Sequence, residues 1–215
     1  TDIVNFTQLS AEDEQHALEL IEKQKQIVKP IVEKHSGEWL KEIGDGLLFI
    51  FDSSLDAVNC SIDIQKSLKD IDDFKIRIGI HQGDVFIKDG DVFGDDVNIA
   101  SRVEGFAPEG GIAISDKISK DVSGVKNIKT SFIGHKKLKG VEQETQIRCI
   151  VSHDLPKIKS SRFILFVGYF AYLQGFVRLF IGVYTALNKN LLNGSDVTND
   201  YIVLNFLLSA AYILL

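Results

Sequence analysis

The stretch GDVFGDDVNIASR, residues 90–102, gathers three carboxylates, an Asn and an Arg within thirteen positions. Two other short stretches place an acidic residue beside a turn or a strand end: Asp2 in TDIVNFT and Asp45 in KEIGDG. Carboxylate oxygens are ligands for hard divalent cations, and a guanidinium presents a fork of donors that matches phosphate oxygens. These residue types could therefore build a site for phosphate chemistry, with Asp91 as a further carboxylate near a strand end.

Each of these features also has a simpler interpretation. Asp45 and Asp89 both precede a glycine, and Asp-Gly pairs commonly form the turns of β-hairpins. Asn98 and Arg102 are four residues apart and so project from one face of a helix, but a solvated helix face explains that spacing as well. The joint occurrence of the three stretches favours a functional site.

Hydrophobic spacing and turn signals predict the elements that must position these residues. Ser10 followed by Asp13 marks the start of a helical region, and Pro30 predicts a kink or a break between two helices near it. The predicted elements are a helical region at 10–34, a strand–turn–strand at 38–51, a helix at 55–68, a half-buried strand at 74–80, a hairpin turning at 89–90, a helix at 97–107, a strand at 111–115, a helix at 115–122 and two strands ending near 151. The order β-αα-β-β-α-β-β-α-β-α-β-β predicts an α+β sandwich of helices on a mostly antiparallel sheet.

Charge is distributed unevenly along the 215 residues. Of the 24 basic residues 21 precede Arg162, as do 28 of the 30 acidic residues, so this part has a net charge of −7. It therefore lacks the broad basic surface that nucleic-acid binding requires, and we expect no nucleic-acid partner. Cys60 and Cys149 have no metal-binding or disulfide spacing, which favours a reducing compartment. Because the sequence has no initiator Met and stops within an apolar run, we expect it to be part of a longer protein.

Three regions are predicted: a folded domain at 1–151, a polar linker at 152–162 and a transmembrane region at 163–215 with two helices, the second truncated. Residues 163–186 would span about 36 Å as a helix, against a hydrocarbon core of about 30 Å. Gln174 and Arg178 argue against a span, since a charge near the membrane centre costs about 3 kcal/mol, and a buried core helix is the alternative. Basic residues flank the first span on the domain side, which predicts a membrane protein with its folded domain in the cytoplasm.

Three motifs in register, TDIVNFTQLS, KEIGDG and GDVFGDDVNIASR, together with LKG at 138–140, resemble the catalytic domain of class III nucleotidyl cyclases. Members of that family carry patterns like F-x-D-I-x-G-F-T, K-x-x-G-D and D-x-x-G-x-x-V-N-x-A-x-R, and the resemblance spans about residues 1–151. It implies a ferredoxin-like or palm-like α+β fold with an antiparallel-rich sheet. Diguanylate cyclases could share a palm-like sheet, but their G-G-D-E-F signature is absent here.

The resemblance also implies roles for individual residues. Asp2 and Asp45 match the paired carboxylates that hold two Mg²⁺ or Mn²⁺ ions, and such ions also bind substrate phosphates. Asn98 matches the residue that orients the ribose, and Arg102 matches the residue that stabilises charge on the phosphate. The implied reaction converts a nucleoside triphosphate to a cyclic monophosphate and pyrophosphate.

Base preference follows from two further matches. Lys41 and Asp91 match the positions that contact the purine edge, where a Lys donates to a ring nitrogen of adenine and an Asp accepts from its exocyclic amine. Guanylate-specific relatives usually carry Glu and a small residue there, so ATP is the expected substrate. Lys139 resembles the lysine that binds the triphosphate, although Lys136 and Lys137 are alternatives.

The sequence departs from the family pattern at two positions. Asn5 replaces the usual Gly where the chain turns after Asp2, but Asn tolerates left-handed geometry better than most residues, so we expect the loop to form. Asp84 stands where some members carry an Arg that touches phosphate. Asp95 and Asp96 are interpreted as turn and helix-cap residues, because negative charge is favourable at a helix N-terminus.

In this family the site forms between two subunits, and this chain carries both sets of residues. A homodimer with two equivalent sites is therefore implied. The function favoured by these arguments is an adenylate cyclase that acts in cyclic nucleotide signalling. The alternatives are a guanylate or relaxed-specificity cyclase, and a catalytically inactive nucleotide-sensing domain.

Overall fold

The computed structural model describes residues 1–88, 91–138, 141 and 144–157. The chain divides into two compact units, Thr1–Ile158 and Lys159–Leu215, and all of the described residues belong to the first. No helix within the described residues is long and apolar enough to cross a membrane. The membrane region predicted at 163–215 lies outside the described residues, so membrane attachment stays a prediction.

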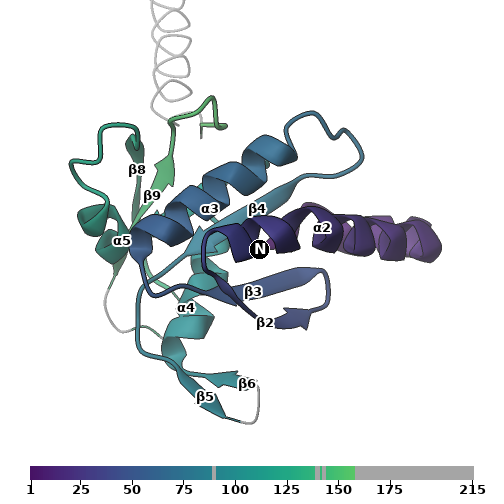
Figure 1. The fold of residues 1–215 in the computed structure, drawn as a ribbon, viewed down its shortest axis with the longest axis horizontal. Helices are drawn as coiled ribbons and strands as arrows, with labels where there is room; N and C mark the ends of the chain where they lie inside the picture. Colours follow the sequence, from purple (N-terminus) through teal and green to yellow (C-terminus); the bar gives the residue numbers. More distant parts are fainter. Residues whose placement is uncertain (89–90, 139–140, 142–143, 158–215) are drawn as a thin grey trace, which may run out of the picture. The chain divides into compact units, whose positions relative to one another are not determined.

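The fold is built on a five-stranded sheet with the order β1-β4-β7-β9-β8 (Figure 1). Its strands are β1 (Asp2–Ile3), β4 (Ile76–Ile80), β7 (Ile112–Ser115), β8 (Thr130–Lys136) and β9 (Thr145–Ile150). Only β4 and β7 pair in parallel, and the other neighbours are antiparallel. This arrangement confirms the predicted α+β class with a mostly antiparallel sheet.

Two hairpins and five helices complete the described part. The hairpins are β2 (Glu38–Ile43) with β3 (Gly46–Ile50), and β5 (Phe86–Lys88) with β6 (Asp91–Phe93); the helices are α1 (Phe6–Glu12), α2 (Glu14–Lys34), α3 (Ser54–Ser67), α4 (Asp95–Glu104) and α5 (Asp116–Asp121). The predicted order had one strand fewer, because the strand at 74–80 and the hairpin after it are separate elements. The predicted turn residues 89 and 90 lie outside the described residues, but β5 and β6 pair antiparallel on either side of them.

The break in the N-terminal helical region lies at Asp13, not at Pro30. Asp13 has extended backbone geometry, and its side chain accepts a hydrogen bond of 2.9 Å from the backbone N–H of His16, which caps α2. Ser10 lies within α1 and caps nothing. Pro30 is on the exposed face of α2, where water can bond the carbonyl that has lost its partner, so the helix continues through it.

The first hairpin forms as predicted, but its turn is one residue earlier. Ile43 pairs with Gly46, so the two turn residues are Gly44 and Asp45 rather than Asp45 and Gly46. Gly44 has a φ of 61°, a conformation that glycine adopts without a steric penalty. The shift leaves Asp45 within the turn itself, directly before β3.

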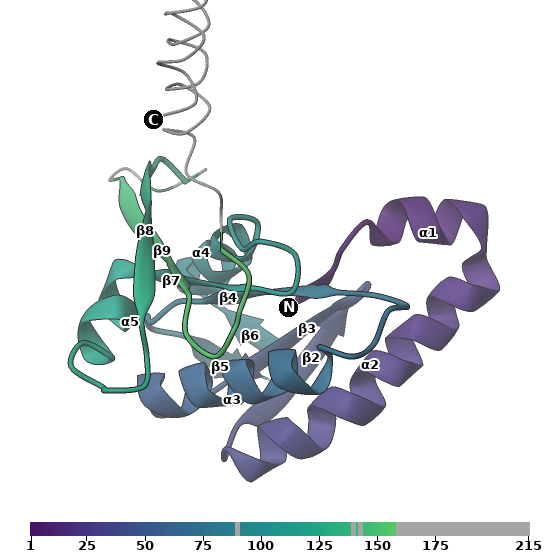
Figure 2. The same cartoon turned by 90° about the horizontal axis from the view of Figure 1, so that it is seen from above.

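Strand β4 has helices on both faces. Phe74, Ile76, Ile78 and Ile80 are buried in the main core with α2 and α3, as the alternation predicted. Arg77 and Gly79, between them, are partly buried because α4 packs on the opposite face, so the alternation of the predicted half-buried strand is confirmed. Figures 1 and 2 show α3 and α4 on opposite sides of β4.

A glycine lets α4 approach β4 closely. A Cβ at Gly79 would lie 2.3 Å from the backbone nitrogen of Glu104 and 2.6 Å from the carbonyl oxygen of Ala100. Val103, on the same helix, is fully buried in a second small core with Ala107. The backbone of the helix therefore rests directly on the strand, and its position follows from the absence of a side chain at Gly79.

This contact predicts that Gly79→Ala destabilises the domain. The added methyl would collide with helix backbone that cannot rotate away, and such overpacking typically costs about 1–3 kcal/mol of unfolding free energy. Gly105→Ala is the matched control, because its Cβ would meet nothing closer than 3.7 Å and its backbone is already helical. Urea denaturation of both variants measures the difference. Equal stability of the two variants would contradict the close approach of α4.

Candidate active site

The structure brings the two predicted metal ligands together. Asp2 is in β1, and Asp45 is in the turn between β2 and β3. The Asp45 Oδ2 accepts a hydrogen bond of 2.8 Å from the backbone N–H of Ile3, which joins the turn to β1. A pocket of about 330 Å³ opens there and is lined by Asp2, Ile3, Asn5, Phe6, Thr7, Gln8 and Asp45.

The electrostatics of this pocket favour a cation. Burial raises the pKa of Asp2, and the charge and hydrogen bonding of Asp45 raise it further. The positive charge of Arg77, which lies opposite Asp2 on β4, lowers it only in part. Two carboxylates that repel one another in a half-buried pocket are relieved by a divalent cation, so the donor set fits Mg²⁺ or Mn²⁺.

The described residues supply only part of a coordination sphere. No group of three or more His, Cys, Asp and Glu side chains that could hold a metal occurs among them. Magnesium is typically bound by one or two carboxylates, with water and substrate phosphates as the other ligands. The pair of Asp2 and Asp45 is consistent with that mode of binding.

The loop after Asp2 forms although it lacks the usual glycine. Asn5 has left-handed geometry, with φ 60° and ψ 24°, and its carbonyl accepts from the backbone N–H groups of Gln8 and Leu9. The expectation that Asn would tolerate this conformation is confirmed. The first turn of α1 is thereby held beside the two carboxylates, where Phe6 and Thr7 line the pocket.

Asn98 and Arg102 lie one turn apart on α4, as their spacing predicted. Asn98 is exposed and Arg102 is half-buried. Asp95 and Asp96 occupy the first turn of this helix, and Gly94 is its N-cap. The prediction that Asp95 and Asp96 are turn and helix-cap residues is wrong about the cap, which is Gly94, but both acidic residues lie at the helix N-terminus, where negative charge is favourable.

The two predicted purine contacts lie on elements that touch. Lys41 is on β2, opposite Leu48, and Asp91 begins β6, opposite Lys88. Strands β2 and β6 contact each other, although they belong to different hairpins. The structure therefore places the two positions on neighbouring hairpins. Lys139 lies outside the described residues.

Comparison with known proteins now identifies the family. Residues 1–151 match the family described as the adenylate and guanylate cyclase catalytic domain. The chain belongs to the class III nucleotidyl cyclases.

The chain is similar to bacterial proteins named as adenylate cyclases. It is 35% identical over 155 residues to "Putative adenylate cyclase 3" of Rhizobium meliloti, covering 68% of this chain and 26% of that protein. It is 29% identical over 123 residues to an adenylate cyclase of Streptomyces griseus, covering 56% of this chain and 31% of that protein. The chain thus spans about a quarter to a third of the length of these two relatives.

Solved structures support the same fold. The crystal structure of an adenylate/guanylate cyclase/hydrolase from Silicibacter pomeroyi is 26% identical with a TM-score of 0.66, covering 73% of this chain and 93% of that one. The adenylyl cyclase CyaB from P. aeruginosa is also 26% identical, with a TM-score of 0.62, covering 72% of this chain and 93% of that one.

The predicted site residues of this chain do not all line one pocket. Asp2 and Asp45 line the pocket described above, whereas Lys41, Asn98 and Arg102 are not among its lining residues. These three come instead from β2 and α4. The described part of a single chain therefore does not assemble all predicted functions in one pocket.

Sequence reasoning missed two charged residues next to the carboxylates. Burial raises the pKa of Glu104, at the end of α4, and the charge of Asp2 raises it further. Arg77 opposes both shifts. The alternation in FKIRIGI placed Arg77 on the face of the strand opposite the main core. This alternation was the sequence signal that could have indicated a charged residue near the carboxylates.

Repulsion between Asp2 and Asp45 predicts that Asp45→Asn increases stability without metal and weakens metal binding. Without divalent ions, Asp45→Asn should raise the unfolding free energy by about 0.5 kcal/mol, a modest gain because water screens a half-buried pair. The amide oxygen can still accept from the Ile3 N–H. Added Mn²⁺ at about ten times its dissociation constant should stabilise the unmodified cyclase by about 1.4 kcal/mol and this variant by much less.

Thermal unfolding with EDTA and with Mn²⁺ measures both effects. Asp72→Asn, which changes an exposed carboxylate on a loop, is the control and should keep the full response to Mn²⁺. Equal stabilisation of Asp45→Asn and the unmodified cyclase by Mn²⁺ would show that Asp45 is not a ligand.

Proposed function

We propose that this chain is an adenylate cyclase that converts ATP to 3′,5′-cyclic AMP and pyrophosphate at a homodimer interface. The observation that carries the proposal is the pairing of Asp2 and Asp45 in one pocket, together with matching residues at the purine, ribose and transition-state positions. Relatives named as adenylate cyclases support the choice of ATP.

The proposed reaction is an in-line displacement. The ribose 3′-oxygen bonds to the α-phosphorus, the bond from that phosphorus to the bridging oxygen breaks, pyrophosphate leaves, and the hydroxyl proton passes to solvent. Two Mg²⁺ or Mn²⁺ ions, when bound to Asp2 and Asp45, would lower the pKa of the 3′-hydroxyl and neutralise phosphate charge. Asn98 would orient the ribose by hydrogen bonding, and the Arg102 guanidinium would stabilise charge that develops on the phosphate oxygens.

Lys41 and Asp91 would select the base. Lys41 would donate to a ring nitrogen of adenine, and Asp91 would accept from the exocyclic amine; guanine presents the opposite pattern at this edge. The contact between β2 and β6 is consistent with the assignment, because Lys41 and Asp91 lie on these two strands. Lys139 would bind the triphosphate.

Homodimerisation explains why one chain separates these groups. In a two-fold dimer the carboxylates of one subunit would face Asn98, Arg102 and the purine contacts of its partner, and the same pairing would occur twice. Strand β5 is a candidate part of the interface, since Phe86 and Ile87, on its two faces, are 74% and 50% exposed.

An assay of product formation tests the activity. With Mn²⁺ or Mg²⁺ the chain should form cyclic AMP from ATP at least about tenfold faster than cyclic GMP from GTP, because paired donors and acceptors discriminate bases strongly. Asp45→Ala should retain less than about 1% of the activity. Equal use of GTP would instead support a relaxed-specificity or guanylate cyclase. Absence of any cyclic nucleotide from a verified dimer would support the nucleotide-sensing alternative.

Mixing two inactive variants tests the shared site. Asp45→Ala and Arg102→Ala damage opposite halves, so a mixed dimer should contain one intact site and one site with both defects. Equal amounts that exchange freely should recover about a quarter of the unmodified activity, because half of the dimers are mixed and each has one of two sites. Mixing Asp45→Ala with Asp2→Ala is the control and should recover none. Failure of the first mixture after confirmed subunit exchange would contradict a site made by two chains.

A further inference from the structure

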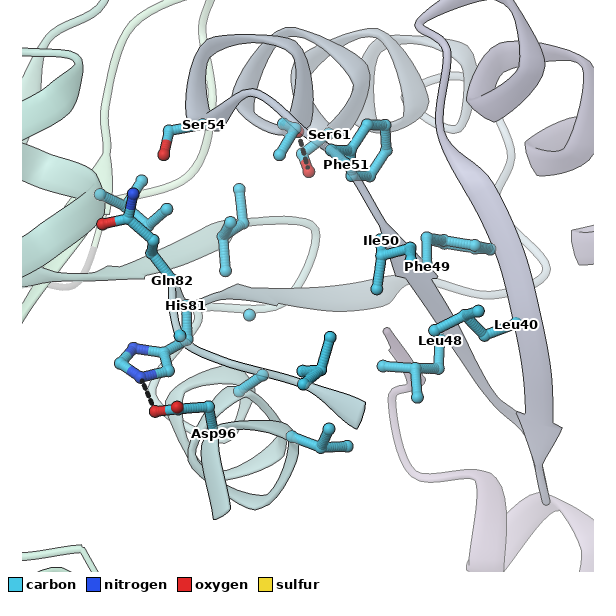
Figure 3. A pocket seen from close by; sticks show the side chains of 18 of the residues that line it. Leu40, Leu48, Phe49, Ile50, Phe51, Ser54, Ser61, His81, Gln82 and Asp96 are labelled. Carbon is cyan, nitrogen blue, oxygen red and sulfur yellow. Dashed lines mark hydrogen bonds and ion pairs between the residues drawn. The ribbon is translucent and has the colours of Figure 1, made fainter. Parts of the chain in front are cut away.

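A buried histidine links the sheet to the first turn of α4. His81 directly follows β4, and its side chain is 7% exposed. Its Nε2 lies 3.0 Å from Asp96 Oδ1 and its Nδ1 lies 2.8 Å from Ser115 Oγ, at the end of β7. Figure 3 shows His81 and Asp96 on one side of a cavity of about 290 Å³, opposite Leu48 and Ile50 of β3.

The partners determine the state of the ring. A carboxylate only accepts hydrogen bonds, so Nε2 carries the hydrogen and donates to Asp96, while Nδ1 accepts from the Ser115 hydroxyl. Burial lowers the pKa of His81; Asp96 opposes this shift, and the charge of Lys117 on α5 adds to it. Ser115 is 1% exposed, so it has no access to a substrate, and the three residues form a structural link rather than a nucleophilic site.

Asp96 is held from a second direction. Its Oδ2 accepts a hydrogen bond of 2.9 Å from the backbone N–H of Asp84, in the segment that follows His81. A Cβ at Gly83 would lie 1.9 Å from the Asp96 carboxylate carbon, so this segment wraps closely around the carboxylate. Both carboxylate oxygens of Asp96 therefore have hydrogen-bond partners, and these bonds hold the first turn of α4 to the segment that follows β4.

The two ends of α4 are held by different contacts. Its C-terminal half packs on the sheet, where Ala100 and Glu104 approach Gly79 and Val103 is buried in the second core. The link from His81 to Asp96 holds the N-terminal turn. Asn98 and Arg102 both lie between Asp96 and Glu104, so their positions depend on how both ends are held.

We propose that His81 is a positioning residue for the cyclase reaction, which holds α4 so that Asn98 and Arg102 reach the ribose and phosphate of the bound nucleotide. This inference rests on the proposed function, and it predicts a selective effect. A displacement of about 1 Å in a catalytic group can reduce turnover about 100-fold. Nucleotide affinity depends mainly on the carboxylate pocket and the purine contacts, which His81 does not touch.

The test compares variants of the 215-residue chain. His81→Phe keeps a ring but cannot donate to Asp96, and it should lower kcat at least about 10-fold with the KM for ATP changed less than about 3-fold. His81→Gln can still donate to Asp96 and should stay within about 3-fold of the unmodified kcat. His35→Phe is the matched control, because it breaks another His–Asp contact of 3.0 Å, with Asp63, far from α4 in sequence; it should leave kcat unchanged.

A variant background shows whether His81 acts through Asn98 and Arg102. In a chain that carries both Asn98→Ala and Arg102→Ala, adding His81→Phe should reduce the residual rate less than about 2-fold, because both groups that it positions are already gone. A full multiplicative loss in this background would overturn the proposal, as would equal losses in His81→Phe and His35→Phe. If His81→Phe does not fold, Asp96→Ala breaks the same link from the helix and is held to the same criteria.

Amide hydrogen exchange tests whether His81 holds α4, independently of whether the chain has cyclase activity. Amides in 95–104 should exchange at least about 10-fold faster in His81→Phe, while those of α3 should not change, and His35→Phe should alter neither. If the unmodified chain forms no cyclic nucleotide, the proposed function fails and exchange alone decides whether His81 fastens α4. Unchanged exchange in 95–104 would overturn the proposal whatever the activity.

Discussion

Two half-buried carboxylates held side by side are the constraint on which the rest of the site depends. Asp2 and Asp45 come from elements 43 residues apart, and one hydrogen bond, from the Ile3 N–H to Asp45, joins the two elements. Burial raises the pKa of Asp2, and the charge and hydrogen bonding of Asp45 raise it further, so a charged pair at this place is unfavourable without a cation. The fold must supply the free energy that keeps them together, and a divalent cation returns part of it on binding.

The scaffold supplies that free energy through the sheet and its main core. Strand β4 pairs with β1 on one edge and β7 on the other, and its apolar side chains fill the core between the sheet and the helices α2 and α3. The opposite face of the same strand carries α4, in contact through Gly79. One strand therefore positions Asp2 by backbone pairing and Asn98 and Arg102 by helix packing.

Arg102 and the two carboxylates come from different elements. Asp2 and Asp45 line one pocket, and Arg77 lies opposite Asp2 in the sheet. Arg102 is on α4 and is not among the residues that line this pocket. In the proposed two-fold dimer, Arg102 of one subunit would reach the nucleotide held by the carboxylates of the other.

The sequence by itself determined the elements, the α+β class, the family and the types of residue in the site. These features depend on local spacing: the alternation in 74–80, the Asp-Gly signal near Asp45 and the interval between Asn98 and Arg102. Tertiary structure alone decided that the helical region breaks at Asp13, that the hairpin turns at Gly44 and that both faces of β4 are covered. It also decided that Asp2 and Asp45 lie in one pocket and that His81 contacts Asp96 of α4. Such contacts join residues distant in sequence and depend on how whole elements pack.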